Sequence, residues 1–156
     1  MKKKGEPLDI RFDFGGNVGN SMDSLRLLRW VQHTEGNAKS ESLADLLAQW
    51  HFEMRRCVAS HEVLSAAAAV VGLDASDVAR VLSDPSVCRK SVVDSIERIH
   101  RRGIHAIPFF KITMRSGDRA ATTTVDGALD EAGFTEALSK LESSYKEEEE
   151  GQKQMR

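Results

Sequence analysis

The stretch from Gly103 to Ile112 constrains the fold of this chain most, because it combines a helix stop, a tight turn and the start of a strand. Gly103 follows a long helical pattern, and glycine adopts the left-handed conformation that closes many helices without a Cβ clash. Pro108 stands directly before the apolar run Phe-Phe-Lys-Ile. Proline has no backbone N–H, so it is expected at the beginning of a strand. Such a position is also a reasonable one for a cis peptide bond.

The residues before this stretch predict five helices, of which the first two carry long apolar stripes. Asn20 is expected to cap the first helix, and Ser42, with Asp45 three residues later, to open the second. Apolar residues at helical spacing should face a core. The expected buried faces are Met22, Leu25, Leu28 and Val31 in the first helix, and Leu43, Leu46, Leu47, Trp50, Met54 and Cys57 in the second.

The next three helices have clearer start and stop signals. Ser60 is expected to start the third helix, which Gly72 stops, and Asp74 to cap the fourth. The dipeptide Asp84-Pro85 should start the fifth, because proline is favoured at the first helical position. The expected apolar stripe of the fifth helix is Cys88, Val92, Ile96 and Ile99.

A hairpin and one more helix are predicted after the proline. Residues 109–114 and 122–125 read as two strands joined by a turn at 116–118. The last helix has an apolar face made of Phe134, Ala137, Leu138 and Leu141. Near the N-terminus, Leu8, Ile10, Phe12 and Phe14 alternate with charged residues, which is typical of a half-buried extended segment.

Four segments of the chain together resemble the DsbA-like thioredoxin family, in particular its FrnE-like branch. Residues 103–112 are similar to the family's "GVPFF" proline loop. Residues 19–28 are similar to its "GNTxDxHRLL" helix start, with Ser21 in place of threonine and Leu25 in place of histidine. Residues 63–82 look like the helix pair around "GLD", and residues 125–138 look like the closing strand and helix "VSGAQ…F…AL".

The resemblance implies an α+β, mostly helical chain with a truncated DsbA-like thioredoxin fold. One domain would cover residues 1–146, with an all-α insertion at about 20–102 and a C-terminal β-β-α unit at about 103–145. Residues 147–156 are rich in charge and are expected to form a disordered tail. The family's initial strand, Cys-x-x-Cys helix and second strand would be missing from the front.

The missing front carries the family's redox chemistry. The chain has two cysteines, Cys57 and Cys88, and no Cys-x-x-Cys. By the resemblance both lie in the helical insertion, and we expect two free thiols that behave as small buried hydrophobes. A disulfide or a reactive thiol, including a Cys57 nucleophile with a histidine base, is the alternative. The related kappa-class glutathione transferases place a serine at the same absent position.

The candidate site is the proline loop, where the family presents backbone to its substrate. The resemblance implies substrate-binding residues Ile107 and Pro108, with His105 beside them, although His105 also reads as an exposed turn residue. No residue is predicted to be catalytic. Histidine and cysteine spacing fits no metal site, and the glycines at 15–19 fit no nucleotide motif, so no cofactor is expected.

Composition and charge limit the partners and the compartment. The net charge of −2 gives no reason to expect nucleic acid or an anionic membrane. No signal peptide or membrane-spanning run is recognisable, so a soluble, cytoplasmic protein is expected. A lone hairpin is marginal in water and leaves an unpaired strand edge. A protein or peptide partner, a second copy of the chain or a missing N-terminal half is expected to cover it.

Three functional hypotheses follow. In the first, the chain is a DsbA-like domain, by family a thiol-disulfide oxidoreductase, that is redox-inactive and keeps a proline-loop binding surface. In the second, it is a subunit or fragment of an active oxidoreductase or of a glutathione-transferase-kappa-like enzyme. In the third, it is a purely helical protein-interaction module. Whether the chain is itself an enzyme differs between these hypotheses.

Overall fold

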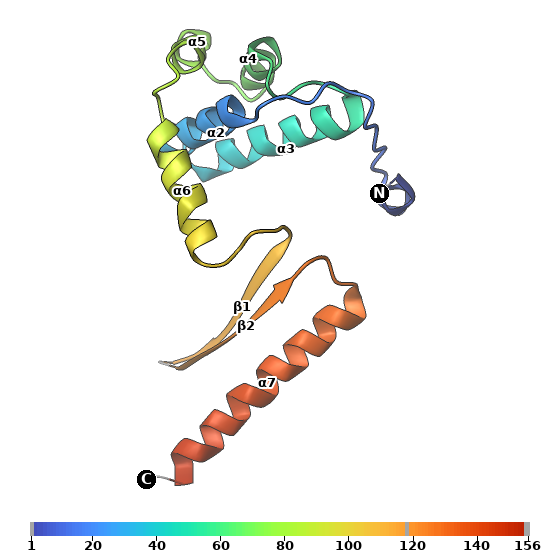
Figure 1. The fold of residues 1–156 in the computed structure, drawn as a ribbon, viewed down its shortest axis with the longest axis vertical. Coiled ribbons are helices and arrows are strands. Elements are labelled where there is room, and N and C mark those ends of the chain that lie inside the picture. Colours follow the sequence, from blue (N-terminus) through green and yellow to red (C-terminus); the bar gives the residue numbers. More distant parts are fainter. Residues whose placement is uncertain (1, 118, 155–156) are drawn as a thin grey trace. The chain divides into compact units, whose positions relative to one another are not determined.

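The computed structural model describes residues 2–117 and 119–154, and these form two compact units that divide between Glu97 and Arg98 (Figure 1). The first unit is helical and the second is built on a hairpin and one long helix. The helices before the hairpin are α1 Lys2–Gly5, the 3-10 turn η1 Glu6–Leu8, α2 Met22–Thr34, α3 Asn37–Met54, α4 His61–Val70, α5 Ala75–Ser83 and α6 Arg89–Arg101.

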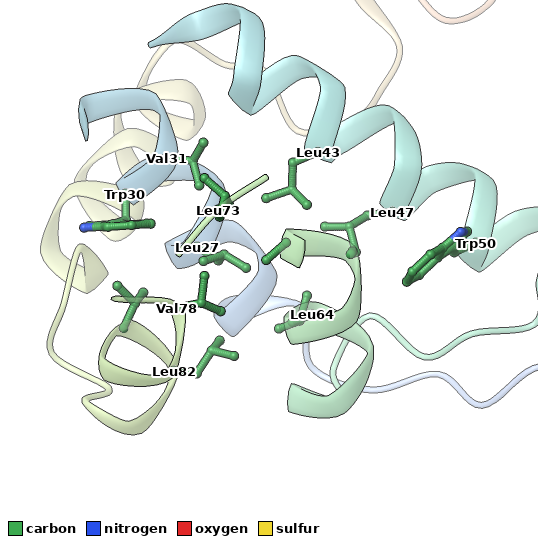
Figure 2. Close-up of a cluster of buried hydrophobic side chains, with 13 residues drawn as sticks. Leu27, Trp30, Val31, Leu43, Leu47, Trp50, Leu64, Leu73, Val78 and Leu82 are labelled. Atoms are coloured by element: carbon green, nitrogen blue, oxygen red, sulfur yellow. The ribbon is translucent and has the colours of Figure 1, made fainter. Parts of the chain in front are cut away.

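The core of the first unit lies among helices α2 to α5. Figure 2 shows apolar side chains from these four helices pointing into one interior. Leu27 and Val31 come from α2, Leu43 from α3, and all three are fully buried. The remaining members are Trp30, Leu47, Trp50, Leu64, Ala67, Ala68, Leu73, Val78, Val81 and Leu82. Burial of this apolar surface is the main stabilising contribution to the unit.

Two of the predicted helix starts are confirmed. Ser60 is the N-cap of α4, and its hydroxyl accepts a hydrogen bond from the N–H of Val63 at 3.4 Å. Asp74 is the N-cap of α5, and its carboxylate accepts hydrogen bonds from the N–H groups of Ser76 and Asp77. Gly72, which was expected to stop α4, has the positive φ of +75° that a helix-ending glycine adopts.

The predicted start of the second helix at Ser42 is wrong. Helix α3 begins at Asn37, directly after Gly36, whose φ of +92° breaks the preceding helix. The Ser42 hydroxyl donates to the carbonyl of Ala38 at 3.0 Å, so this side chain bonds back along the helix instead of capping it.

The predicted start of the fifth helix at Pro85 is also wrong. The Asp84 carboxylate accepts from the N–H of Ser86 at 2.9 Å, which makes a local turn, and Cys88 has a left-handed φ of +57°. Helix α6 therefore begins at Arg89. The side chain of an aspartate before a proline favoured a turn here over an immediate helix start.

The buried face of α2 differs from the expected one. Leu27, Trp30 and Val31 are buried, while Leu25, which was expected in the core, is 39% exposed. Arg26 lies next to Leu27 on the buried side, with its side chain fully enclosed. Exposed apolar residues also occur on the expected stripes of the other helices, namely Met54, Ile96, Ile99 and Leu138.

The N-terminal segment is extended but forms no strand among the described residues. The rings of Phe12 and Phe14 stack with centroids 5.7 Å apart, and both meet the edge of Phe52 on α3. The N–H of Asp13 donates to the carbonyl of Phe52 at 2.6 Å. The alternating apolar residues of this segment therefore pack against the C-terminal end of α3 and not in a sheet.

The second unit consists of β1 Phe109–Ser116, β2 Arg119–Asp126 and α7 Glu131–Gln154. The strands pair antiparallel from Phe109 opposite Asp126 to Ser116 opposite Arg119, which confirms the predicted hairpin. One face packs on α7, where the rings of Phe110 and Phe134 meet edge to face at 4.9 Å. The buried residues of this layer are Ala121, Val125 and Leu141.

Successive side chains of a strand alternate between faces, and the face opposite α7 is mainly polar apart from Phe109 and Ala120 at its ends. There the hydroxyls of Thr113 and Thr122 hydrogen-bond across the strands at 3.0 Å. Helix α7 continues through residue 154, into the segment predicted to be a disordered tail. The side chains beyond residue 146, residues 155–156 and the turn residue Asp118 lie outside the described part of the chain. No helix in that part is long and apolar enough to cross a lipid bilayer.

Candidate functional site

The candidate site is the loop of residues 103–108, which leads from the end of α6 into β1. Helix α6 ends in two hydrogen bonds: the N–H of Gly103 donates to the carbonyl of His100 at 2.9 Å, and that of Ile104 to the carbonyl of Ile99 at 3.3 Å. Gly103 has a φ of +76°. This pair of bonds around a left-handed glycine is a Schellman motif, which stops the helix at a defined point.

The other end of the loop is attached to the hairpin. The carbonyl of Pro108 accepts a hydrogen bond from the N–H of Gly127 at 2.9 Å, and the next residue, Phe109, pairs with Asp126. The peptide bond between Ile107 and Pro108 is cis. The loop is therefore held at both ends by backbone hydrogen bonds.

Ile107 is the most exposed large apolar residue of the described chain, at 91%. Neither its N–H nor its carbonyl makes a hydrogen bond within the described residues. An aliphatic side chain and an unpaired backbone thus lie side by side on a surface loop. A bound peptide segment could bury the Ile107 side chain and form hydrogen bonds with the Ile107 backbone.

The structure places His105 on the same loop, exposed, with its ring centroid 5.6 Å from that of His100 at the end of α6. Pro108 is exposed as well. All three residues predicted for the site, His105, Ile107 and Pro108, therefore lie together on the surface of the second unit. No cluster of three or more potential metal ligands occurs among the described residues.

The two cysteines lie outside this unit. Cys57 follows α3 and Cys88 precedes α6; both are free thiols, and both are half-buried where buried side chains were expected. Residues 98–156 contain no cysteine. The unit that carries the proline loop consequently has no thiol of its own for exchange with a disulfide.

One polar cluster in the helical unit was missed by the sequence prediction. The Arg26 guanidinium donates to Asp23 Oδ1 from Nε at 3.1 Å and from Nη2 at 3.0 Å, and His61 Nε2 lies 2.7 Å from Asp23 Oδ2. The hydrogen bond with His61, and to a lesser extent Arg26, holds the pKa of Asp23 below its ordinary value, although partial burial acts in the opposite direction. The sequence signal that could have revealed this cluster is Arg26, a charged residue between Leu25 and Leu27 in the apolar pattern of α2.

Comparison with known proteins gives one informative similarity. No protein-family model matches the chain, and no curated protein matches it. The crystal structure of a probable DsbA oxidoreductase from Streptomyces coelicolor superimposes with a TM-score of 0.70 at 23% sequence identity. The match covers 90% of this chain and 57% of the other. The chain therefore has a DsbA-like α+β fold and spans somewhat more than half the length of that protein.

Proposed function

We propose that this chain is a DsbA-like domain, of the FrnE-like branch, that binds protein or peptide segments at the Ile107–Pro108 loop without catalysing dithiol exchange by itself. The observation that carries the proposal is Ile107, which is 91% exposed and has an unpaired backbone between two anchored loop ends. An extended peptide placed against this loop would gain both apolar contact and backbone hydrogen bonds.

The expected lack of redox activity rests on the placement of sulfur. Dithiol exchange needs an accessible thiolate and a second thiol that can resolve the mixed disulfide. Cys57 and Cys88 are half-buried, unpaired and both in the helical unit, whereas the loop belongs to residues 98–156. This distribution supports binding without exchange.

A subunit or fragment of an active oxidoreductase is the second candidate. Within the described residues the sheet contains only β1 and β2, so each strand has an edge without a neighbouring strand. The chain also spans only 57% of the similar DsbA-like structure. A partner polypeptide that supplies further strands and the thiols would give such an assembly an activity that the chain alone lacks.

The binding proposal is tested with carboxymethylated, fluorescently labelled insulin B chain as the probe, because it is extended and has no free thiol. We expect saturable binding by fluorescence anisotropy. Ile107→Ser should weaken it at least fivefold, for a loss of about 1 kcal/mol of apolar contact. Val18→Ser is the matched control, since Val18 is 86% exposed in the other unit. Equal effects of the two substitutions would refute the proposed site.

The redox part needs a separate assay. We expect no turnover in insulin reduction with dithiothreitol above the rate without protein, and unchanged probe binding by the Cys57→Ser/Cys88→Ser variant. Turnover that disappears in that variant would show that the chain is an oxidoreductase in its own right. Turnover that appears only when a partner protein is added would favour the second candidate.

A further inference from the structure

A second candidate site lies in the helical unit, where the N-terminal segment meets the C-terminal half of α3. The pocket has a volume of about 430 Å³. Its walls come from Ile10 and Phe12 on one side and from Ala48 and Phe52 on the other, and Asp45, Gln49 and Glu53 complete the lining. A volume of this size is within the range of ligand-binding pockets.

The aromatic walls are held in place by contacts outside the pocket. Phe52 meets Phe12 edge to face with centroids 6.1 Å apart, and Phe14 stacks on Phe12 and also meets Phe52 edge to face at 6.4 Å. The backbone hydrogen bond from Asp13 to Phe52 and the 2.7 Å ion pair between Arg55 and Asp13 fasten the segment to the helix end. Phe52 nevertheless remains 39% exposed, so part of an apolar wall faces solvent.

The charged residues that line this pocket are both acidic, Asp45 and Glu53, and no basic side chain lines it. Glu53 accepts a hydrogen bond from the backbone N–H of Arg11 at 3.2 Å, and the Asp45 carboxylate has no partner among the described residues. Neither neighbouring arginine lines the pocket: Arg55 pairs with Asp13 at 2.7 Å, and the side chain of Arg11 is 89% exposed, with its guanidinium 4.0 Å from Asp9. Two carboxylates therefore border an aromatic surface without a cation between them.

We propose that this pocket binds a lysine or arginine side chain, flanked by apolar residues, from a protein partner. The methylene stem of such a side chain can lie along Phe12 and Phe52, while its cationic head reaches the carboxylates. Arginine suits the site best, because a guanidinium stacks on aromatic rings and pairs with carboxylates. An acidic ligand would be repelled, and a purely apolar ligand would leave the carboxylates desolvated and unpaired.

This site is independent of the proline-loop proposal. It lies in residues 1–97, and the loop lies in residues 98–156. An Ile107→Ser variant should therefore bind an arginine-containing peptide at this pocket as tightly as the wild type does. Each proposal has its own variant, Ile107→Ser for the proline loop and Asp45→Asn for the pocket. A negative result for one site therefore does not decide the other.

The test uses the full chain and a fluorescein-labelled peptide with the sequence Leu-Leu-Arg-Leu, followed by anisotropy at low ionic strength. The matched probe replaces arginine by citrulline, which has nearly the same shape and no charge. A third peptide carries glutamate instead. We expect the arginine peptide to bind at least about tenfold more tightly than the citrulline peptide, and the glutamate peptide not to bind.

Variants of the chain then locate the site. Asp45→Asn should weaken binding of the arginine peptide two- to fivefold, about the effect of one exposed ion pair. Glu62→Gln removes the same charge from α4, outside the pocket, and should change nothing. Phe52→Leu should weaken binding of both the arginine and citrulline peptides. Since Asp45 is exposed, Asp45→Asn decides the question even if Phe52→Leu fails to fold.

Three results would overturn the proposal. The first is equal affinity for the arginine and citrulline peptides, and the second is equal affinity of the Asp45→Asn and Glu62→Gln variants. The third is concentration-dependent self-association, measured by light scattering, that Asp45→Asn abolishes, because the occupant would then be a second copy of the chain. Selective, Asp45-dependent binding by a monomeric chain supports the proposal.

Discussion

Arg26 on α2 donates a hydrogen bond from Nη1 to the carbonyl oxygen of Val81 at the end of α5, at 3.0 Å. The same nitrogen also lies 2.9 Å from the carbonyl of Asp84 and 3.0 Å from that of Val87. One buried side chain thus satisfies carbonyl groups at a helix C-terminus and in the following turn. A helix end without such partners would leave polar atoms unpaired.

Arg26→Met should lower the free energy of unfolding of the helical unit by about 3 kcal/mol, because it leaves buried carbonyls unsatisfied. Urea denaturation followed by circular dichroism measures this. Arg29→Met is the matched control on the same helix, since within the described residues Arg29, which is half-buried, bonds to the side chains of Gln32 and Ser95 and to no backbone carbonyl. Equal losses in the two variants would contradict the role assigned to Arg26.

Asp23 should make the stability of the helical unit depend on acid pH. Its folded-state pKa is lower than the ordinary 3.8, mainly through His61, so ionised Asp23 stabilises the fold above about pH 3.8. That contribution is lost as the pH falls through the lowered folded value. The stability difference between wild type and Asp23→Asn, measured by urea denaturation, should shrink between pH 6 and pH 2.5. His61→Ala should reduce the same pH dependence. If the stability difference between wild type and Asp23→Asn stayed constant from pH 6 to pH 2.5, the role assigned to Asp23 would be wrong.

Gly103→Ala should destabilise the end of α6, because alanine at a φ of +76° costs about 1 kcal/mol relative to glycine. An added Cβ would meet no atom of a more distant residue within 4 Å, so the cost arises from the Cβ and its own local backbone in the left-handed conformation. Gly103→Asn should destabilise the end of α6 less than Gly103→Ala does, since asparagine tolerates the left-handed region. Amide hydrogen exchange at Gly103 or its replacement and at Ile104 reports the change. Similar exchange in all three proteins would argue against the helix-stop role.

Leu141→Ala should loosen α7 from the hairpin. Leu141 is 3% exposed, and truncation of a buried leucine costs about 2–5 kcal/mol. Leu138 lies on the same helix at 48% exposure, so Leu138→Ala should cost less than about 1 kcal/mol. Hydrogen exchange of β2 amides measures the loosening in this unit separately. Faster exchange in the Leu138 variant than in the Leu141 variant would be the contrary result.

The proline loop could be located from sequence because its signals are local. The left-handed glycine at 103 and the proline at 108 act through backbone conformation, which depends on the residue itself and its neighbours. Local signals also explain why the caps at Ser60 and Asp74 and the hairpin after Pro108 were predicted correctly.

Other local signals were ambiguous, and the contacts of the fold resolved them. Serine can cap a helix or bond back inside one, and Ser42 does the second. Aspartate before proline can open a helix or close a turn, and Asp84 does the second. The positions of α3 and α6 depended on which of these alternatives the surrounding packing allowed.

By itself, the sequence determined the order of the elements, the two best capped helices, the hairpin and the loop that carries Ile107. Only the tertiary structure decided that Arg26 is buried while Leu25 is exposed, and that Phe12 and Phe52 border an acidic pocket. The physical reason is range: caps and turns are formed by residues a few positions apart. Burial and charge pairing depend on residues such as Arg26 and Val81, which are distant in the chain and adjacent only after folding.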